Sequence, residues 1–139
     1  MNTLTFRKNL FRLNAGFLVL MGGVFGVLDY VGFRTGNGPL GDLLQGNFLA
    51  VGMQEAHGLA FIIGLLLFTY ALRTMDPSWH LVGAGVHLLL GGSNLIFWDY
   101  FHGLGIVSPE IVVTAIHWLF VFAHMFSYFS VRTKTQAIT

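Results

Sequence analysis

The sequence predicts an all-α membrane protein with four transmembrane helices in an up-down-up-down bundle. Of its 139 residues, 55% are apolar and only 9% are charged, whereas a soluble domain is about a quarter charged. Four apolar runs are each long enough to cross a bilayer. The second and third connections between them are short, so neighbouring helices must be antiparallel. We expect one domain, residues 1–139, embedded in a lipid bilayer.

The first span is predicted over residues 13–33, after a short amphipathic lead over residues 1–12. It is too long for the apolar core of a signal peptide and is not followed by a small-residue cleavage pattern, so we expect it to be retained. Gly22 and Gly26 form a GxxxG pair, which lets a second helix approach closely. Asp29 is a polar residue near its far end.

The second span is predicted over residues 48–72. It follows the only sizeable loop, residues 34–47, whose glycines and proline break helical structure. Within that loop, residues 43–45 are expected to form a short turn on the membrane surface. The first half of the span holds three polar residues, Gln54, Glu55 and His57.

The third span is predicted over residues 79–101, after a tight turn at Asp76 and Pro77. His80, His87 and Asn94 follow one another at intervals of seven, nearly two helical turns, and therefore share a face. Gly83 and Gly91 lie four residues on either side of His87 on that same face. A polar stripe with small residues beside its central histidine predicts a closely packed partner.

The fourth span is predicted over residues 109–131, after a short turn over residues 103–108. Three agreeing signals mark its start: Ser108 as the N-cap, Pro109 in the first helical position and Glu110 in the first turn. A 4,3 rhythm then places one set of residues on a single face: Glu110, Thr114, His117, Val121, His124 and Tyr128.

Positive charge predicts the orientation of the spans. One side of the membrane receives only Arg34, and the other receives the remaining basic residues: Arg7, Lys8, Arg12, Arg73, Arg132 and Lys134. By the positive-inside rule both termini are cytoplasmic, and we expect a plasma membrane of the bacterial inner-membrane type.

Depths counted from the turns predict which histidines meet. His87 and His124 each lie eight residues from a cytoplasmic turn, roughly 12 Å deep at 1.5 Å per residue. His57 and His117 lie nine and eight residues, respectively, from the non-cytoplasmic ends of their spans. The histidines are therefore expected to form two layers, His87 with His124 and His57 with His117.

The leading functional hypothesis is an integral membrane b-type haem protein with a redox or electron-transfer role. Two facing histidines are typical axial ligands of a six-coordinate iron. His87 and His124 are the candidate ligands, with room for the flat macrocycle at Gly83 and Gly91. One haem b fits this spacing, whereas two would crowd.

A transition-metal ion is an alternative ligand. His57, His117 and Glu55 lie within a turn of one depth, and imidazole and carboxylate suit zinc, copper or iron. Glu55 lies about 200° from His57 around the helix, so the two do not converge squarely. The sequence also lacks the Glu-x-x-His pair of di-iron bundles.

A carrier of protons or small solutes is a further alternative, since ionisable residues inside spans tend to face protein and mark pathways. Five polar residues join the histidines in this interpretation: Asp29, Gln54, Asn94, Asp99 and Glu110. Acids close to the end of a span also reach the headgroup region, which is the interpretation we favour for Asp99 and Glu110.

A non-enzymatic accessory subunit is the last alternative, with helix faces that contact a second copy or a larger membrane complex. The net charge of +1 and the absence of a long basic cluster argue against nucleic acid as a partner. With no cysteine, thiolate metal sites and thiol redox chemistry are excluded. Phosphate-binding glycine loops, GxSxG and HExxH are absent, so hydrolytic or kinase chemistry is unsupported.

Overall fold

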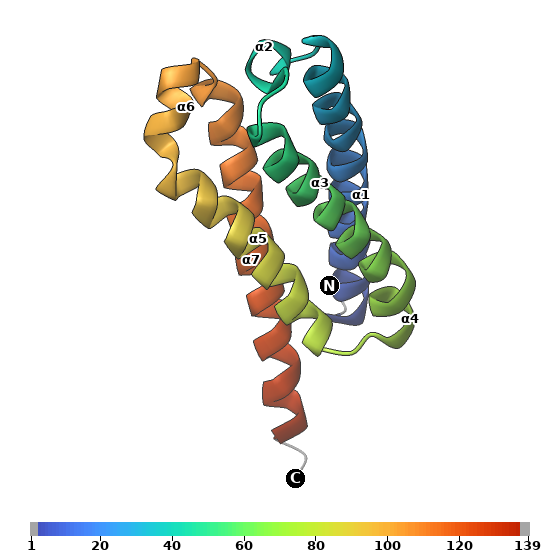
Figure 1. Cartoon of the computed structure of the whole chain (residues 1–139). Coiled ribbons are helices and arrows are strands. Elements are labelled where there is room, and N and C mark those ends of the chain that lie inside the picture. The colour runs from blue at the N-terminus through green and yellow to red at the C-terminus, as the bar shows by residue number, and fades with distance from the viewer. Residues whose placement is uncertain (1–2, 137–139) are drawn as a thin grey trace. The chain divides into compact units, whose positions relative to one another are not determined.

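The computed structural model describes residues 3–136, and the side chains of residues 3–131. Within that range the chain is helical and contains no strand (Figure 1). The elements in order are α1 (Thr3–Thr35), α2 (Gly41–Leu44), α3 (Leu49–Leu66), the π-helical turn η1 (Leu67–Ala71), α4 (Leu72–Thr74), α5 (Ser78–Ile96), α6 (Trp98–Leu104) and α7 (Val107–Gln136). Arg132 and Lys134, on which the predicted orientation partly depends, lie outside the described side chains.

Three stretches of helix are long and apolar enough to cross a membrane: α1, the run Leu49–Thr74 through α3, η1 and α4, and the part of α7 over Val107–Val131. The bent pair α5 and α6 makes a fourth if it counts as one span. An all-α fold with helices long and apolar enough to cross a membrane is thus confirmed. The third span is not one straight rod over residues 79–101, because the helix breaks at Phe97 and bends by 63°.

The starts of α1 and α7 differ from their predicted positions. α1 already begins at Thr3, so the lead over residues 1–12 is continuous with the first span. α7 begins at Val107, which places Ser108 inside the first turn and not at the N-cap. The cause is the tight end of α6, where Gly105 adopts a left-handed conformation (φ 70°) that glycine tolerates without strain. α7 therefore starts two residues beyond that glycine.

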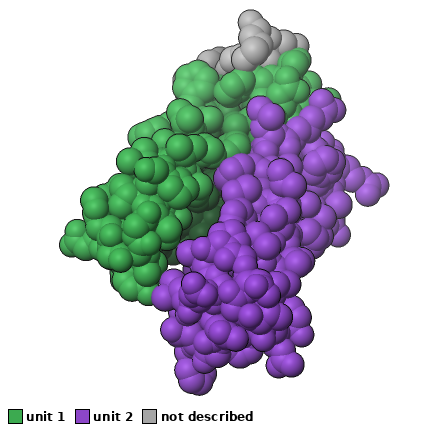
Figure 2. Space-filling model, turned by 90° about the horizontal axis from the view of Figure 1, so that it is seen from above, with its two compact units in different colours: residues 1–10, 75–139 green, residues 11–74 purple. Residues whose placement is uncertain are grey.

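The chain forms two compact units, coloured in Figure 2: residues 1–10 with 75–139, and residues 11–74. Because α1 crosses this division, its first two turns belong to the first unit and the rest belongs to the second. The first unit holds α5, α6 and α7, and the second holds α2, α3, η1 and α4.

In the second unit, α1 and α3 pack antiparallel with their backbones in close contact. A Cβ added at Gly22 would lie 2.6 Å from both the carbonyl oxygen of His57 and the backbone nitrogen of Phe61. Near the other end of α3, a Cβ at Gly64 would lie 2.8 Å from the backbone nitrogen of Val19. The GxxxG pair predicted a close helix approach, and Gly22 confirms it.

In the first unit, α5 is started by the turn at Asp76 and Pro77. The Asp76 carboxylate accepts hydrogen bonds from the hydroxyl of Ser78 and, at 2.8 Å, from its backbone N–H. Those two bonds, the hydroxyl bond first, hold the pKa of Asp76 below its usual value. Asp76 therefore caps the first turn of α5, with Pro77 in the position that needs no N–H donor.

Candidate functional site

α5 and α7 run antiparallel (Figure 1). Their polar residues are hydrogen-bonded to one another across the contact. We call this set the α5–α7 polar stripe: His80, His87, Asn94, Glu110, Thr114, His117 and His124. The helical period brings them together, because residues three, four and seven apart share a face. The predicted polar faces of both helices are thus buried or half-buried, and four imidazoles lie among them at 0–6% exposure.

The four histidines form two hydrogen-bonded pairs. His80 Nδ1 lies 2.9 Å from His124 Nδ1, and His87 Nδ1 lies 2.8 Å from His117 Nδ1. The expected layer of His87 with His124 is therefore wrong, since α7 is displaced along α5 by one heptad from the predicted register. His57, expected beside His117, is hydrogen-bonded to Asp29 in the second unit.

Two glycines of α5 set this register. A Cβ at Gly83 would lie 2.7 Å from His124 Nε2, and a Cβ at Gly91 would lie 3.0 Å from His117 Cβ. Each glycine thus admits a histidine of α7, and Gly91 also leaves room for the indole of Trp118. In this structure, the space that was predicted to accommodate a haem macrocycle is occupied by side chains of α7.

Phe120 lies between the two histidine pairs. Its ring stacks on His87 with centroids 4.6 Å apart and an interplanar angle of 15°. On the other side it stacks on His124, with a centroid distance of 6.3 Å and an angle of 29°. The ring therefore fills the gap between the two proposed axial ligands and divides the stripe into two halves.

The end of the stripe near α6 is closed by an amide, a hydroxyl and a carboxylate. Asn94 Nδ2 donates to Thr114 Oγ1 at 3.0 Å and to Glu110 Oε2 at 3.3 Å. Asn94 and Glu110, both half-buried, thus lie in one cluster. Asp99 is exposed on α6 and lies outside this cluster.

The opposite end is closed by Arg7, a residue that the sequence predicted only as one of the orienting charges. Arg7 is 7% exposed, and its Nε donates to His80 Nε2 at 3.0 Å. The signal was present in the sequence, because Arg7 lies one heptad before the buried Asn14 and in phase with the buried Leu10. Because the first span was predicted to start at residue 13, Arg7 was not assigned to a helix face.

The chemistry of a histidine pair follows from its hydrogen bond. Two neutral imidazoles can face each other through Nδ1 only if one carries its proton there and the other carries it on Nε2. A neutral imidazole can take a proton at one nitrogen while it releases one from the other. A proton can therefore pass from one ring to the other within each pair.

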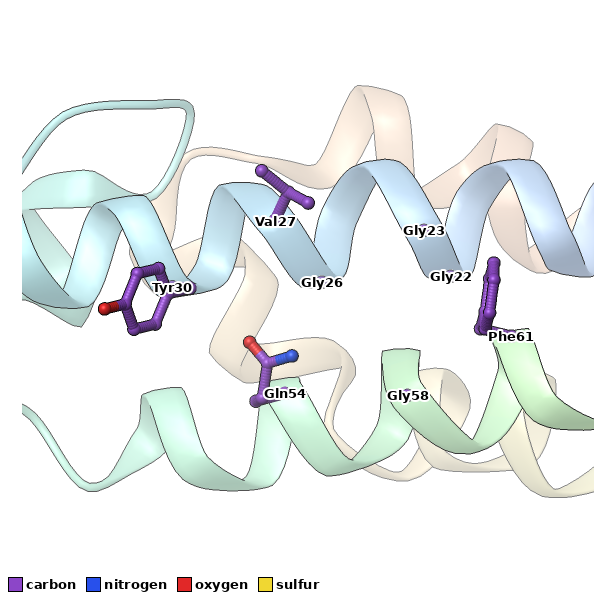
Figure 3. Close-up of a pocket in the computed structure, with 8 residues that line it drawn as sticks. All are labelled: Gly22, Gly23, Gly26, Val27, Tyr30, Gln54, Gly58 and Phe61. Atoms are coloured by element: carbon purple, nitrogen blue, oxygen red, sulfur yellow. The ribbon is translucent and has the colours of Figure 1, made fainter.

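The remaining predicted residues lie in the second unit. His57 Nδ1 is 2.6 Å from the buried carboxylate of Asp29, and its ring stacks on Phe25. Gln54 is exposed and lines an open pocket of about 380 Å³ between α1 and α3 (Figure 3). Gly22, Gly23 and Gly26 line it on the side of α1, and Gly58 and Phe61 line it on the side of α3.

The predicted metal ligands are not brought together in this structure. His57 is paired with Asp29, His117 is paired with His87, and Glu55 is exposed on α3. Across residues 3–131 no group of three or more His, Asp or Glu side chains is placed to hold a metal ion. The structure thus gives the metal hypothesis no support.

Comparison with known proteins adds no assignment to this geometry. No family model, no curated protein and no solved structure matches the chain. Any function proposed for the chain therefore depends on the α5–α7 polar stripe itself.

Proposed function

We propose that the α5–α7 polar stripe conducts protons through the membrane as a histidine relay. The observation that carries the proposal is the pair of Nδ1-to-Nδ1 hydrogen bonds, His80 with His124 and His87 with His117, buried between two helices. Ionisable groups inside spans are expensive and are typical of proton or ion pathways. This is the carrier alternative among the functions that the sequence predicts.

The energetics favour a function over a packing role. A polar group buried without a partner costs free energy, and a well-packed apolar pair of similar volume avoids that cost. The chain instead buries four imidazoles, two on α5 and two on α7. Packing alone gives no reason to retain four such rings.

The relay works by successive exchange along hydrogen bonds. A proton that arrives at the outer nitrogen of one imidazole allows that ring to release its Nδ1 proton to the facing Nδ1 of its partner. The partner then releases a proton from its own Nε2, so each ring gains one proton and loses one. Ring rotation restores the starting tautomers.

The stripe has a proton-exchanging group near each end of this path. Glu110 belongs to the cluster with Asn94 and Thr114 near α6, and His80 belongs to the end near the α4–α5 connection. Between the histidine pairs lies Phe120, stacked on both sides. Proton transfer past Phe120 is the slow step of the proposed relay, since an aromatic side chain offers no proton acceptor.

For the arrangement in the membrane, we propose the up-down-up-down bundle with both termini cytoplasmic, in a plasma membrane of the bacterial type. The antiparallel pairs α1–α3 and α5–α7 support alternating directions. The excess of basic residues at one set of span ends supports the orientation. Association with a second copy or with a larger membrane complex stays a prediction.

Proton flux in liposomes tests the relay. The purified protein is reconstituted with an entrapped pH-sensitive dye, and a potassium gradient drives protons inward. We expect flux above that of protein-free liposomes. The double variant His87→Leu/His117→Leu replaces one whole pair by apolar residues and keeps the packing volume, so it should fold and reduce flux to the protein-free level.

The matched control is His102→Leu, because His102 is an exposed histidine on α6 outside the stripe. Its flux should equal that of the unmodified protein. Equal flux in protein-free and protein-containing liposomes would contradict the proposal. So would a double variant that conducts as well as the unmodified chain.

Haem binding is the second candidate, favoured by one observation: His87 and His124, on facing helices, are both fully buried. Binding would require Phe120 to leave the space between them and both rings to release their present partners. An absorption spectrum of the preparation used for the liposomes distinguishes the two. A Soret band that disappears in both His87→Ala and His124→Ala would support haem, and a colourless conducting protein would support the relay alone.

A further inference from the structure

Arg7 is the one cation that donates a hydrogen bond into the polar stripe among the described side chains, and it lies in the first two turns of α1. Its Nη2 donates to the carbonyl oxygen of Met75 at 2.5 Å, and its Nε donates to His80 Nε2 at 3.0 Å. All three residues belong to the first compact unit. The guanidinium therefore links the start of α1 to the start of α5.

The protonation of His80 follows from the donor. Arginine carries only N–H donors and stays protonated in proteins. His80 Nε2 must therefore present a lone pair, and the proton of the neutral ring must lie on Nδ1. A proton on Nε2 would place two donors 3.0 Å apart, which no hydrogen bond satisfies.

The protonation of His124 follows in turn. Because His80 donates from Nδ1, the facing Nδ1 of His124 accepts, and the proton of His124 lies on Nε2. That nitrogen faces the backbone of α5 at Gly83, where a Cβ would lie 2.7 Å away. One arginine thus determines the tautomers of two buried histidines.

We infer that Arg7 is a positioning residue that fixes the tautomers of the His80–His124 pair and blocks His80 Nε2 as a proton acceptor. For its consequence in transport, this inference rests on the proposed relay. His80 can pass its Nδ1 proton to His124 only if a proton arrives at Nε2. Arg7 occupies that nitrogen as a donor and does not give its own proton up, so its contact closes this end of the path.

The release of Arg7 opens the path. When the guanidinium moves away, His80 Nε2 accepts a proton, and the Nδ1 proton moves to His124. No bond other than N–H bonds forms or breaks, and the ring of His80 has the same charge afterwards as before. The His87–His117 pair lies seven residues further along α5 and serves as an internal comparison.

Nitrogen NMR of the protein labelled with ¹⁵N-histidine in lipid nanodiscs tests the inference directly. Protonated and unprotonated ring nitrogens have distinct shifts, and their couplings to the ring protons identify each tautomer. In the unmodified protein we expect His80 to carry its proton on Nδ1 and His124 to carry its proton on Nε2. The opposite tautomers, or a pair that exchanges freely between them, would overturn the inference.

Three variants sharpen the test. Arg7→Met should give a mixture of tautomers at His80 and raise proton flux in liposomes, whereas Arg7→Lys supplies another obligate donor and should preserve the unmodified tautomers. Arg12→Met is the matched control, since Arg12 is an exposed arginine on the same helix. It should change neither the spectrum nor the flux.

The outcomes separate the inference from the proposed function. Fixed tautomers that are lost in Arg7→Met and kept in Arg7→Lys support the role of Arg7, even if neither the unmodified protein nor any variant conducts protons, in which case the relay alone fails. Tautomers in Arg7→Met identical to those of the unmodified protein overturn the role of Arg7, whatever the flux. If Arg7→Met does not fold, the spectra of the unmodified protein and of Arg7→Lys still show whether His80 and His124 carry the expected tautomers.

Discussion

At the scale of single residues, each described histidine that is buried or half-buried has a hydrogen-bond partner. Histidine on the α5–α7 contact faces histidine, whereas His57 in the second unit faces the carboxylate of Asp29 at 2.6 Å. The two arrangements differ in what happens when one partner is removed. A histidine ring then loses one hydrogen bond to another ring, whereas the buried carboxylate of Asp29 loses its hydrogen bond to His57.

The Asp29–His57 pair therefore gives a prediction about stability. His57→Leu leaves Asp29, at 3% exposure, without its imidazole, and we expect a loss of about 3 kcal/mol in the free energy of unfolding. The double variant Asp29→Leu/His57→Leu removes the charge as well and should recover most of that loss. Denaturant titration of the protein in detergent micelles measures both.

The exposed His102 supplies the control for this pair, since His102→Leu should leave the free energy of unfolding nearly unchanged. A double variant as unstable as His57→Leu would show that the two side chains do not act as a pair.

At the scale of helices, small residues decide which side chains meet. Gly83 and Gly91 lie two turns apart on α5, and each is in contact with a histidine of α7. Gly85 and Gly92 lie on the same helix, and a Cβ added at either meets nothing within 4 Å. Only the first two glycines are therefore required by the packing of α5 on α7.

The contrast between Gly83 and Gly85 gives a prediction at this scale. In Gly83→Ala the new methyl group overlaps the His124 ring, so the ring must shift and its bond to His80 must lengthen. We expect a loss of about 1–3 kcal/mol in stability, typical of overpacking, together with reduced proton flux. Denaturant titration and the liposome assay provide the two measurements.

Gly85→Ala is the matched variant, because it adds the same methyl group to an exposed face of the same helix. It should conserve flux and leave stability unchanged or slightly higher, since alanine favours helix over glycine. Equal effects of the two substitutions would mean that the contact at Gly83 does not set the register.

The periodicity of polar residues in the sequence predicted which faces of α5 and α7 meet. The seven-residue spacing of His80, His87 and Asn94 correctly placed them on one buried or half-buried face. The pairing across the helices could not be derived from the same pattern, because depth was counted from helix ends. α7 begins two residues earlier than predicted, and the heptad repeat of histidines makes two registers look alike.

At the scale of the whole molecule, the polar interior is divided between two antiparallel helix pairs. α5 and α7 carry the proposed histidine relay, and α1 and α3 carry the Asp29–His57 pair. The apolar faces of all four helices remain exposed, as expected for helices surrounded by lipid. The membrane prediction could be made from composition alone, whereas orientation depends on a few basic residues at the span ends.

The proposed orientation gives the last prediction. Because the chain contains no cysteine, a cysteine introduced at one position is the only thiol that a maleimide can label. Single cysteines are introduced at exposed positions in three connections: Asp42→Cys in α2, Thr74→Cys before α5 and His102→Cys in α6. With both termini cytoplasmic, a maleimide that cannot cross membranes should label the first and third from outside intact cells. Thr74→Cys should react only after the cells are opened.

The cysteine-free protein is the control, since it should take up no label before or after the cells are opened. Labelling of Thr74→Cys in intact cells, with Asp42→Cys and His102→Cys protected, would reverse the orientation. The proton path would then run in the opposite sense, with Arg7 and His80 at the outer surface and Glu110 inside. Labelling of Asp42→Cys alone, with Thr74→Cys and His102→Cys both protected, would instead require that the bent pair α5 and α6 enters and leaves the membrane on the same face. No path from Arg7 to Glu110 would then cross the membrane.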